Sequence, residues 1–182
     1  YMAPGVVCTF RKEFKRILSD FLELTGFIDF VKMDKVCKDI QKIKEVNFNM
    51  NMFEKYFKNS EELERIFRKA HKKAIVWTDK LTYQAMESFI HNLNTMHSRA
   101  GAQVPFSSIN FGTDTSFEGR MVIENYLKAA DAGLGHGETP IFPISIFKVK
   151  EGVNYNPTDP NYDLFRLACS VSAKRLFPNF SF

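Results

Sequence analysis

The chain has 182 residues, a length that suits one domain or a piece of a larger one, and 45% of them are hydrophobic, enough for a core. The formal net charge is +4, with lysines and arginines interleaved among acids, so the sequence lacks the basic stripe of a nucleic-acid-binding protein. Cys8, Cys37 and Cys169 form no Cys-x-x-Cys pair, which argues against disulfides or zinc and for a reducing compartment.

Neither an apolar run of membrane-spanning length, about 18 residues, nor a secretion leader is evident, so we expect a cytoplasmic protein. Residues 1–80 are predicted to form a helical segment. Apolar residues recur there at helical spacing, and a serine followed by acids marks one helix start. Helices are predicted over about 7–24, 34–44 and 60–73, with residues 45–59 as a connector or irregular helix.

One face of the first predicted helix is basic, with Arg11, Lys12, Lys15 and Arg16. A solvated surface explains such a face.

Residues 81–182 alternate between helical and strand patterns. Long crossovers of this kind imply parallel strands and an α/β fold. A Thr-x-x-Glu capping box at Thr115 and Glu118 is predicted to start the helix after the first strand, and its N-terminus is a ready anion site. Asp159-Pro160 is predicted to cap the last helix. Helices are expected over about 82–97, from 115 to 133 or 135, and from about 160 to 175; strands are expected over 104–111, 140–149 and 176–182.

Residues 97–120 gather small and polar groups around a short apolar strand. Gly101 lets a ligand approach the backbone closely, and Arg99 offers a planar fork of donors for phosphate or carboxylate. Ser107, Ser108 and Asn110 place polar side chains on or beside the strand.

The sequence shows no recognisable arrangement of catalytic groups. His91 and His97 are six residues apart, which rules out a shared metal site on one helix face, and Cys169 is predicted to be a buried thiol. We therefore assign no catalytic residue and no metal ligand to this chain.

The stretch 97–120 reads HSRAGAQVPFSSINFGTDTSFEGR, and it resembles a segment of the anaerobic (class III) ribonucleotide reductases. Phe117 stands where that family commonly has proline, and His136 where it has asparagine. The missing proline removes some preorganisation of the helix start and no ligand group. Further segments resemble the family in the same order, at 137–144, 147–156 and 172–182, and more loosely at 1–5.

The resemblance implies a fold and a reaction. The fold is a ten-stranded α/β barrel, of which residues 81–182 would supply about three strands in one incomplete domain, with an N-terminal helical layer. The family reduces ribonucleoside triphosphates by glycyl and thiyl radical chemistry, with formate as reductant. An iron–sulfur activase that uses S-adenosylmethionine makes the glycyl radical. A C-terminal zinc site, nucleotide effectors and a homodimer complete the expected enzyme. The resembled family has its effector site on helices near the first predicted helix, which implies contact with an effector phosphate as the alternative to a solvated surface for the basic face of that helix.

The resemblance places the radical residues outside this chain, so the chain would contribute substrate placement alone. Its ends look cut, which also predicts a fragment that is inactive in isolation. The alternatives are another glycyl-radical barrel enzyme, or an inert or complementation-dependent truncated product. The substrate-binding candidates are Ser98, Arg99, Gly101, Gln103, Ser107, Ser108 and Asn110, with ordinary loop and turn residues as the alternative for each.

Overall fold

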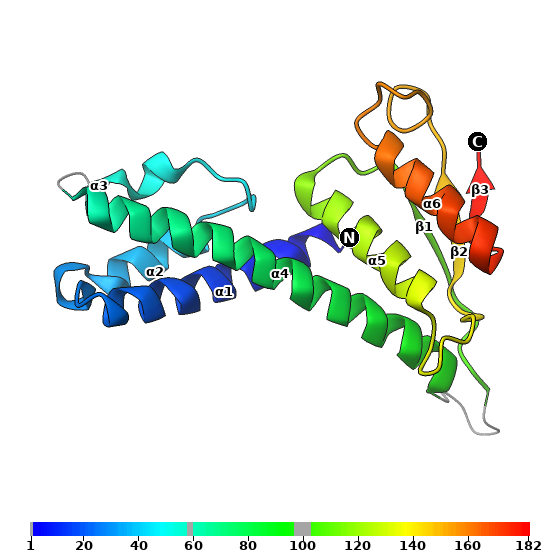
Figure 1. Ribbon diagram of the computed structural model, residues 1–182, viewed down its shortest axis with the longest axis horizontal. Coiled ribbons are helices and arrows are strands. Elements are labelled where there is room, and N and C mark those ends of the chain that lie inside the picture. Colours follow the sequence, from blue (N-terminus) through cyan, green and yellow to red (C-terminus); the bar gives the residue numbers. More distant parts are fainter. Residues whose placement is uncertain (1, 58–59, 97–102) are drawn as a thin grey trace. The chain divides into compact units, whose positions relative to one another are not determined.

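The computed structural model describes residues 2–57, 60–96 and 103–182 (Figure 1). The chain divides into two compact units, Tyr1–Leu81 and Thr82–Phe182. It is a mixed α/β chain in which helices predominate, with a three-stranded parallel sheet. Over the described residues, no helix is both long enough and apolar enough to cross a membrane.

The first unit is built from helices, as predicted. Its elements are α1 (Ala3–Leu24), η1 (Ile28–Phe30), α2 (Met33–Gln41), η2 (Met50–Phe53), α3 (Glu54–Phe57) and the first part of α4 (Glu61–Thr95). The prediction of separate helices over 60–73 and 82–97 was wrong, because α4 is continuous. Residues 74–81 contain no glycine or proline to interrupt it, and Ala74 and Thr78 are buried one turn apart.

An aromatic cluster fills the core of this unit. The rings of Phe10 and Phe14 from α1 stack at 5.7 Å between centroids, and Phe48 lies 5.9 Å from Phe14. His71 of α4 packs edge-on against Phe48 at 5.0 Å, while its Nε2 lies 2.9 Å from the carbonyl oxygen of Val46. His71 therefore pairs an apolar ring environment with a satisfied polar atom, which is how a histidine serves a core.

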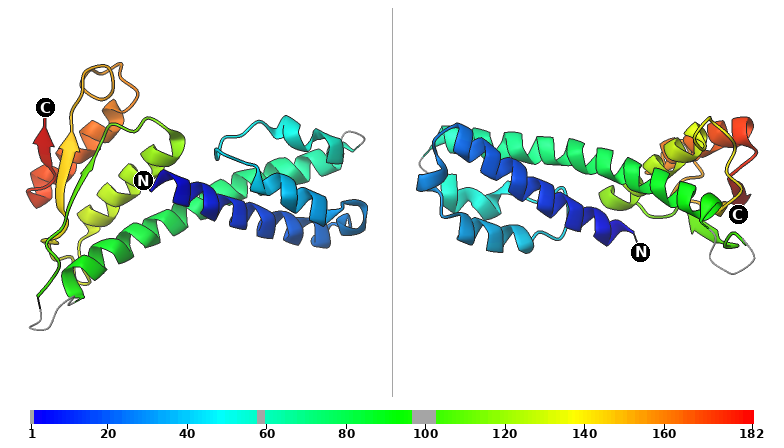
Figure 2. Two further views of the ribbon diagram at one scale, coloured as in Figure 1. Left: turned by 180° about the vertical axis from the view of Figure 1, so that it is seen from behind. Right: turned by 90° about the horizontal axis from the view of Figure 1, so that it is seen from below.

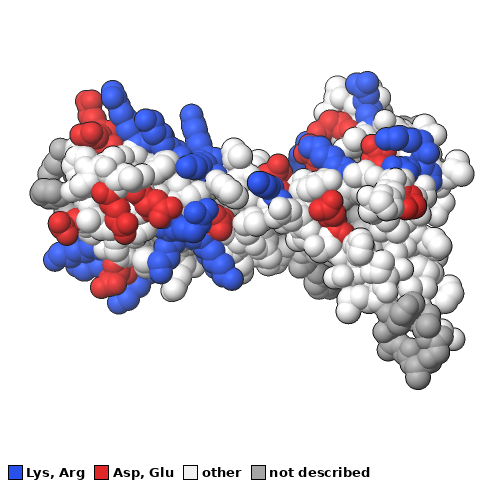
Figure 3. Space-filling view, turned by 60° about the horizontal axis from the view of Figure 1, so that its bottom comes forward, with Lys and Arg blue, Asp and Glu red and all other residues white. Residues whose placement is uncertain are grey.

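The basic face of α1 is partly used by contacts within the unit. Arg11 donates from Nε to the carbonyl oxygen of Ile43 at 2.7 Å. Arg16 pairs with Glu13 at 2.6 Å and lies over the Trp77 ring at 5.5 Å. On the face shown in Figure 3, basic and acidic side chains alternate over the helical unit, so the surface drawn has no basic stripe.

Asp39 of α2 is a charged hub in the first unit. Its carboxylate accepts from Lys42 Nζ at 2.8 Å, Lys55 Nζ at 2.5 Å and the Tyr56 hydroxyl at 2.7 Å. Hydrogen bonds from Lys42, Lys55 and Tyr56 hold the pKa of the Asp39 carboxyl well below its usual value. The side chain is 9% exposed, whereas those of Lys42 and Lys55 are 69% and 60% exposed, so water screens part of the attraction.

Replacing Asp39 with asparagine is expected to lower the free energy of unfolding at pH 7 by about 1–2 kcal/mol, because bonds to a charged acceptor are lost. The folded-state pKa is depressed, so the carboxylate stabilises the fold above its unfolded pKa of about 4, and this contribution fades as the pH falls below that value. Urea unfolding from pH 7 to pH 3 should show the parent and variant curves converging. Glu45→Gln, at an exposed acid beyond α2, is the control and should stay within about 0.5 kcal/mol at every pH.

The second unit contains the end of α4 and an alternating run of strands and helices. These are β1 (Ser108–Phe111), α5 (Phe117–Ala132), β2 (Ile144–Lys148), α6 (Tyr162–Arg175) and β3 (Asn179–Ser181). The strands pair in the order β1-β2-β3, all parallel, as the alternation predicted. Each is shorter than its predicted range, because the flanking prolines and loop residues lie outside the ladder.

Helices α5 and α6 cover the same face of the sheet (Figure 2). Phe147 at the centre of β2 is fully buried against Leu127 of α5 and Leu164 of α6. The inward face of α6 carries Leu164, Ala168 and Val171, which are buried. The prediction of a buried Cys169 was wrong: the residue is exposed, because it lies next to Ala168 on the helix and so turns away from the sheet.

Candidate functional site

The strands present two different faces. Ile109 and Phe111 of β1 pack toward the helices, as do Ser145 and Phe147 of β2 and Phe180 of β3. Because side chains alternate along a strand, their neighbours point the other way. This second side, the open face, carries Ser108, Asn110, Ile144, Ile146, Lys148, Asn179 and Ser181.

The open face mixes amides, hydroxyls, one lysine and aliphatic groups. The strand register sets Asn110 beside Ile146 and Ile146 beside Asn179, with neighbouring strands about 4.8 Å apart. Within the described structure, Ile146 is half-buried and its companions on this face are exposed. Such a surface offers hydrogen-bond partners and apolar contacts together, which suits a polar organic ligand.

The carboxyl ends of β1 and β2 are joined by two buried asparagines. Asn154 donates from Nδ2 to the carbonyl oxygens of Gly112 at 3.0 Å and Lys148 at 2.9 Å. Asn161 donates to Gly112 at 3.2 Å and to Asp114 at 2.8 Å. Gly112 has φ of 120°, and a Cβ there would lie 2.8 Å from the Lys148 carbonyl oxygen, so this junction requires glycine.

Arg120 of α5 extends the junction toward α6. Its Nη1 donates to Asn161 Oδ1 at 2.7 Å and also to the carbonyl oxygen of Pro160, while Nη2 pairs with Asp163 at 2.6 Å. The prediction that Asp159 caps α6 was wrong. Asp159 instead accepts from the backbone amides of Tyr155 and Asn156 at 2.9 and 2.8 Å, which closes the preceding loop.

The N-terminus of α5 already holds a carboxylate. Asp114 Oδ1 accepts from the Ser116 amide at 2.9 Å, and Ser116 Oγ accepts from the Gly119 amide at 3.0 Å. The cap is therefore Ser116 and not the predicted pair of Thr115 and Glu118. Two of the donors expected to form an anion site are used within the chain.

The helix-facing side of β2 contains a buried hydroxyl pair, Tyr126 and Ser145, whose oxygens lie 2.5 Å apart. Ser145 donates onward to the carbonyl oxygen of Pro143 at 3.1 Å, so the phenol of Tyr126 donates to Ser145. Burial raises the pKa of Tyr126 to about 12. This pair thus stays neutral and fixes α5 on the sheet.

The predicted site residues fall into three groups. Ser98, Arg99 and Gly101 lie outside the described residues. Ser108 and Asn110 share the open face, and Gln103 is exposed at the amino side of β1. Ser107 accepts from the Ile144 amide at 2.8 Å through its carbonyl, while its Oγ is buried with no hydrogen-bond partner among the described residues.

A pocket of about 530 Å³ lies elsewhere in this unit, between α4 and the glycine-rich turn after α5. Its lining includes Glu87, His91 and Gly135, and none of the described site candidates. Among the described residues no group of three or more histidines, cysteines or acids could hold a metal ion.

Three positioning residues were missed from the sequence: Arg120, Asn154 and Asn161. Asparagines before and after a Pro-Thr-Asp-Pro loop, as in residues 154–161, were a usable signal, since buried amides often fasten loops. Arg120 lies within a helical pattern, where nothing local distinguishes it from a surface residue.

A run of parallel strands and crossover helices with a polar sheet face belongs to the α/β class of proteins, many of which bind ligands at the ends of their strands. The family model described as anaerobic ribonucleoside-triphosphate reductase matches residues 11–182. The chain belongs to this family.

Curated relatives carry the same description. The chain is 35% identical to the anaerobic ribonucleoside-triphosphate reductase of Haemophilus influenzae over 128 residues, which is 70% of this chain and 18% of that protein. It is 39% identical to the protein of that name from Escherichia coli over 103 residues, 56% of this chain and 14% of the relative. The corresponding enterobacteria phage T4 protein is 43% identical over 103 residues, 56% of this chain and 17% of the relative. The chain thus spans between 14% and 18% of the length of these relatives.

Proposed function

We propose that this chain is a segment of an anaerobic ribonucleoside-triphosphate reductase that holds the nucleotide while the rest of the polypeptide performs the reduction. The family match over residues 11–182 supports the reaction and favours a reductase over another glycyl-radical barrel enzyme. The observation that carries the role of this segment is the open face, with Ser108 and Asn110 on β1 beside Ile144 and Ile146 on β2. In a closed barrel this face would line the interior.

The complete enzyme would contain the remaining strands of a ten-stranded barrel. It would draw its radical chemistry from a glycyl radical installed by an S-adenosylmethionine-dependent iron–sulfur activase, with formate as reductant and zinc in a separate site. Nucleotide effectors, a homodimer and a cytoplasmic location belong to the same proposal.

Within this segment, binding is assigned to seven residues around β1. Gln103, Ser108 and Asn110 supply side-chain donors and acceptors for a base or sugar, and Arg99 supplies a fork for phosphate. Gly101 allows close approach, and Ser98 and Ser107 add hydroxyl groups. The Ser107 Oγ, unpartnered in the described structure, supports its inclusion, because a buried hydroxyl needs a partner.

The test uses a polypeptide of the relatives' length that contains these residues, with Arg99→Ala, Gln103→Ala and Asn110→Ala made separately. Each variant is expected to raise the KM for ribonucleoside triphosphates about tenfold, the effect of one lost hydrogen bond of about 1.4 kcal/mol. Gln84→Ala, at an exposed position on α4, is the matched control for Gln103→Ala and should leave KM unchanged. Unchanged KM and effector response for all four nucleotides in the three variants would falsify the assignment.

A further inference from the structure

Asn94, in the last turn of α4, is bonded to a segment that lies almost fifty residues further along the chain. Its Oδ1 accepts from the amides of Ile141 at 2.8 Å and Phe142 at 3.0 Å. Its Nδ2 donates to the carbonyl oxygen of Phe142 at 2.6 Å and to that of Ile90, one turn back on α4, at 2.7 Å. One side chain thus satisfies three backbone groups at the entrance to β2.

The chemistry of this contact requires a primary amide. Two donors and two acceptor sites are all used, so an aspartate would set an oxygen against two carbonyl oxygens, and an alanine would remove the partner of the Ile141 amide and of the Phe142 amide and carbonyl. Glutamine carries the same groups on a longer stem and would have to leave this geometry.

The same segment also holds the start of β1. The ring of Phe106 meets the ring of Phe142 edge-on at 5.0 Å between centroids. The Ser107 carbonyl oxygen accepts from the Ile144 amide at 2.8 Å. Asn94 and Phe106 therefore flank Gln103 in the sequence, and both are fastened to residues 141–144.

Of these two contacts with residues 141–144, the contact made by Asn94 is the more specific. Phe106 is 89% exposed, so its ring contact with Phe142 excludes little water. Asn94 contributes four hydrogen bonds of 2.6–3.0 Å with its amide half-buried. Removing it would free the end of α4 from the entrance to β2 while leaving the contacts of Phe106 and Ser107 in place.

We propose that Asn94 is a positioning residue for nucleotide binding: by joining the end of α4 to Ile141 and Phe142, it sets the distance between the two ends of the connection that carries Gln103. The inference rests on the proposed function, because the connection matters to the reaction only if Gln103 contacts substrate. Asn94 itself touches backbone alone and takes no part in the chemistry.

The test compares Asn94→Ala and Asn94→Asp with Asn92→Ala, in the polypeptide of the relatives' length. Asn92 is the same residue type two positions away, and its side chain is exposed. Asn94 Oδ1 accepts hydrogen bonds from the Ile141 and Phe142 amides, so hydrogen exchange at these amides should speed up about tenfold or more in Asn94→Ala. In Asn94→Asp a carboxylate oxygen can still accept from these amides but faces two carbonyl oxygens, so the increase should be smaller. The KM for ribonucleoside triphosphates should rise about tenfold with kcat within about twofold, and Asn92→Ala should change neither readout.

Combining Asn94→Ala with Gln103→Ala separates the two proposals. If Asn94 acts through this connection, the double variant should have a KM close to that of the worse single variant, since the same contact is lost twice. Faster exchange with an unchanged KM in Asn94→Ala, while Gln103→Ala raises KM, would overturn the positioning role and leave the proposed function standing. Unchanged amide exchange in Asn94→Ala would show that the Asn94 side chain does not hold Ile141 and Phe142. An unchanged KM in Gln103→Ala would remove the role of Gln103 and this inference with it, while Arg99→Ala and Asn110→Ala would still test the proposed function.

Discussion

Replacing Asn154 with alanine is expected to lower the free energy of unfolding of the chain by about 3 kcal/mol. The side chain is fully buried and satisfies three backbone groups: the carbonyl oxygens of Gly112 and Lys148 and the amide of Lys150, at 2.8–3.0 Å. Each buried group that loses its partner costs about 1–3 kcal/mol, and Asn161 still donates to Gly112, which limits the total.

Asn154→Asp is the sharper variant, because it places a carboxylate oxygen against two carbonyl oxygens in a buried site. We expect it to destabilise the fold more than alanine does, and the loss to shrink at low pH, where the new carboxyl group is protonated. Asn156→Ala, two residues away and half-buried, is the matched control and should cost less than about 1 kcal/mol. Urea unfolding followed by far-ultraviolet circular dichroism measures all three. Equal midpoints for Asn154→Ala and Asn156→Ala would show that the amide does not join the two strands.

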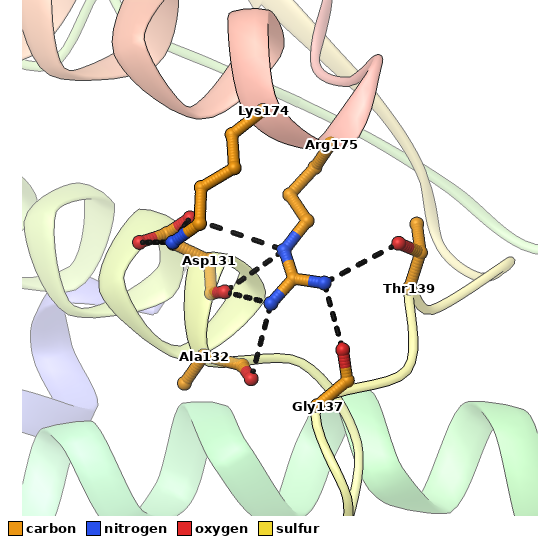
Figure 4. Close-up of polar contacts among 6 residues, drawn as sticks. All are labelled: Asp131, Ala132, Gly137, Thr139, Lys174 and Arg175. Carbon is orange, nitrogen blue, oxygen red and sulfur yellow. Dashed lines mark hydrogen bonds and ion pairs between the residues drawn. The ribbon is translucent and has the colours of Figure 1, made fainter.

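The second large loss of folding stability is expected on replacing Arg175, at the end of α6 (Figure 4). Its Nε donates to the carbonyl oxygen of Asp131 at 2.9 Å, and Nη2 reaches that of Ala132 at 3.3 Å, so the guanidinium caps the last turn of α5. Nη1 donates to the carbonyl oxygen of Gly137 at 2.8 Å, in the turn that leads toward β2. A cation at a helix C-terminus also meets the negative end of the helix dipole.

Arg175→Met keeps much of the aliphatic stem and removes these bonds, so the free energy of unfolding should fall by about 2–3 kcal/mol. Arg175→Lys should recover only a minor part, because one ammonium cannot span the carbonyls of Asp131 and Gly137 together. The control is Lys174→Met. Lys174 pairs with the same Asp131 at 2.9 Å, but its side chain is 61% exposed, so the loss should be about 0.5 kcal/mol or less. Similar unfolding midpoints for the Arg175 and Lys174 methionine variants would contradict the capping role.

Both variants act on the framework behind the open face. Asn154 joins the carboxyl ends of β1 and β2, and Arg175 fixes the end of α6 to the turn that precedes β2. Because Asn110 reaches the open face from β1, a shift of β1 against β2 would move it relative to Ile146. We therefore expect the Asn154 and Arg175 variants to weaken nucleotide binding only as far as they loosen the sheet. Asn110→Ala, in contrast, should weaken binding while leaving the unfolding midpoint nearly unchanged.

In the second unit, the order and type of the elements that follow α4 were readable from the sequence. Helical spacing of apolar residues, the polar run after Val149 and Gly133 at the end of α5 are local signals, and the structure has parallel strands linked by helices as they predicted. The family was readable too, because the segment 97–120 is a contiguous motif.

The cap of α5 and the exposure of Cys169 were predicted wrongly. Thr115 and Glu118 matched a capping pattern, yet Ser116 caps α5, since Asp114 turns back to bond its amide. Cys169 matched an apolar helix interior, yet it is exposed, because the sheet fixes which face of α6 is buried.

Sequence alone determined the family and the alternating pattern of elements, because both depend on residues that are neighbours along the chain. Only the tertiary structure showed that Asn94, Arg120, Asn154, Asn161 and Arg175 fasten the second unit. Their partners lie about 40 residues away or more in most cases, as with Asn154 and Gly112 at 42 residues and Arg175 and Asp131 at 44. A buried amide or guanidinium has the same local signature as an exposed one, and only the folded backbone determines which carbonyl groups it meets.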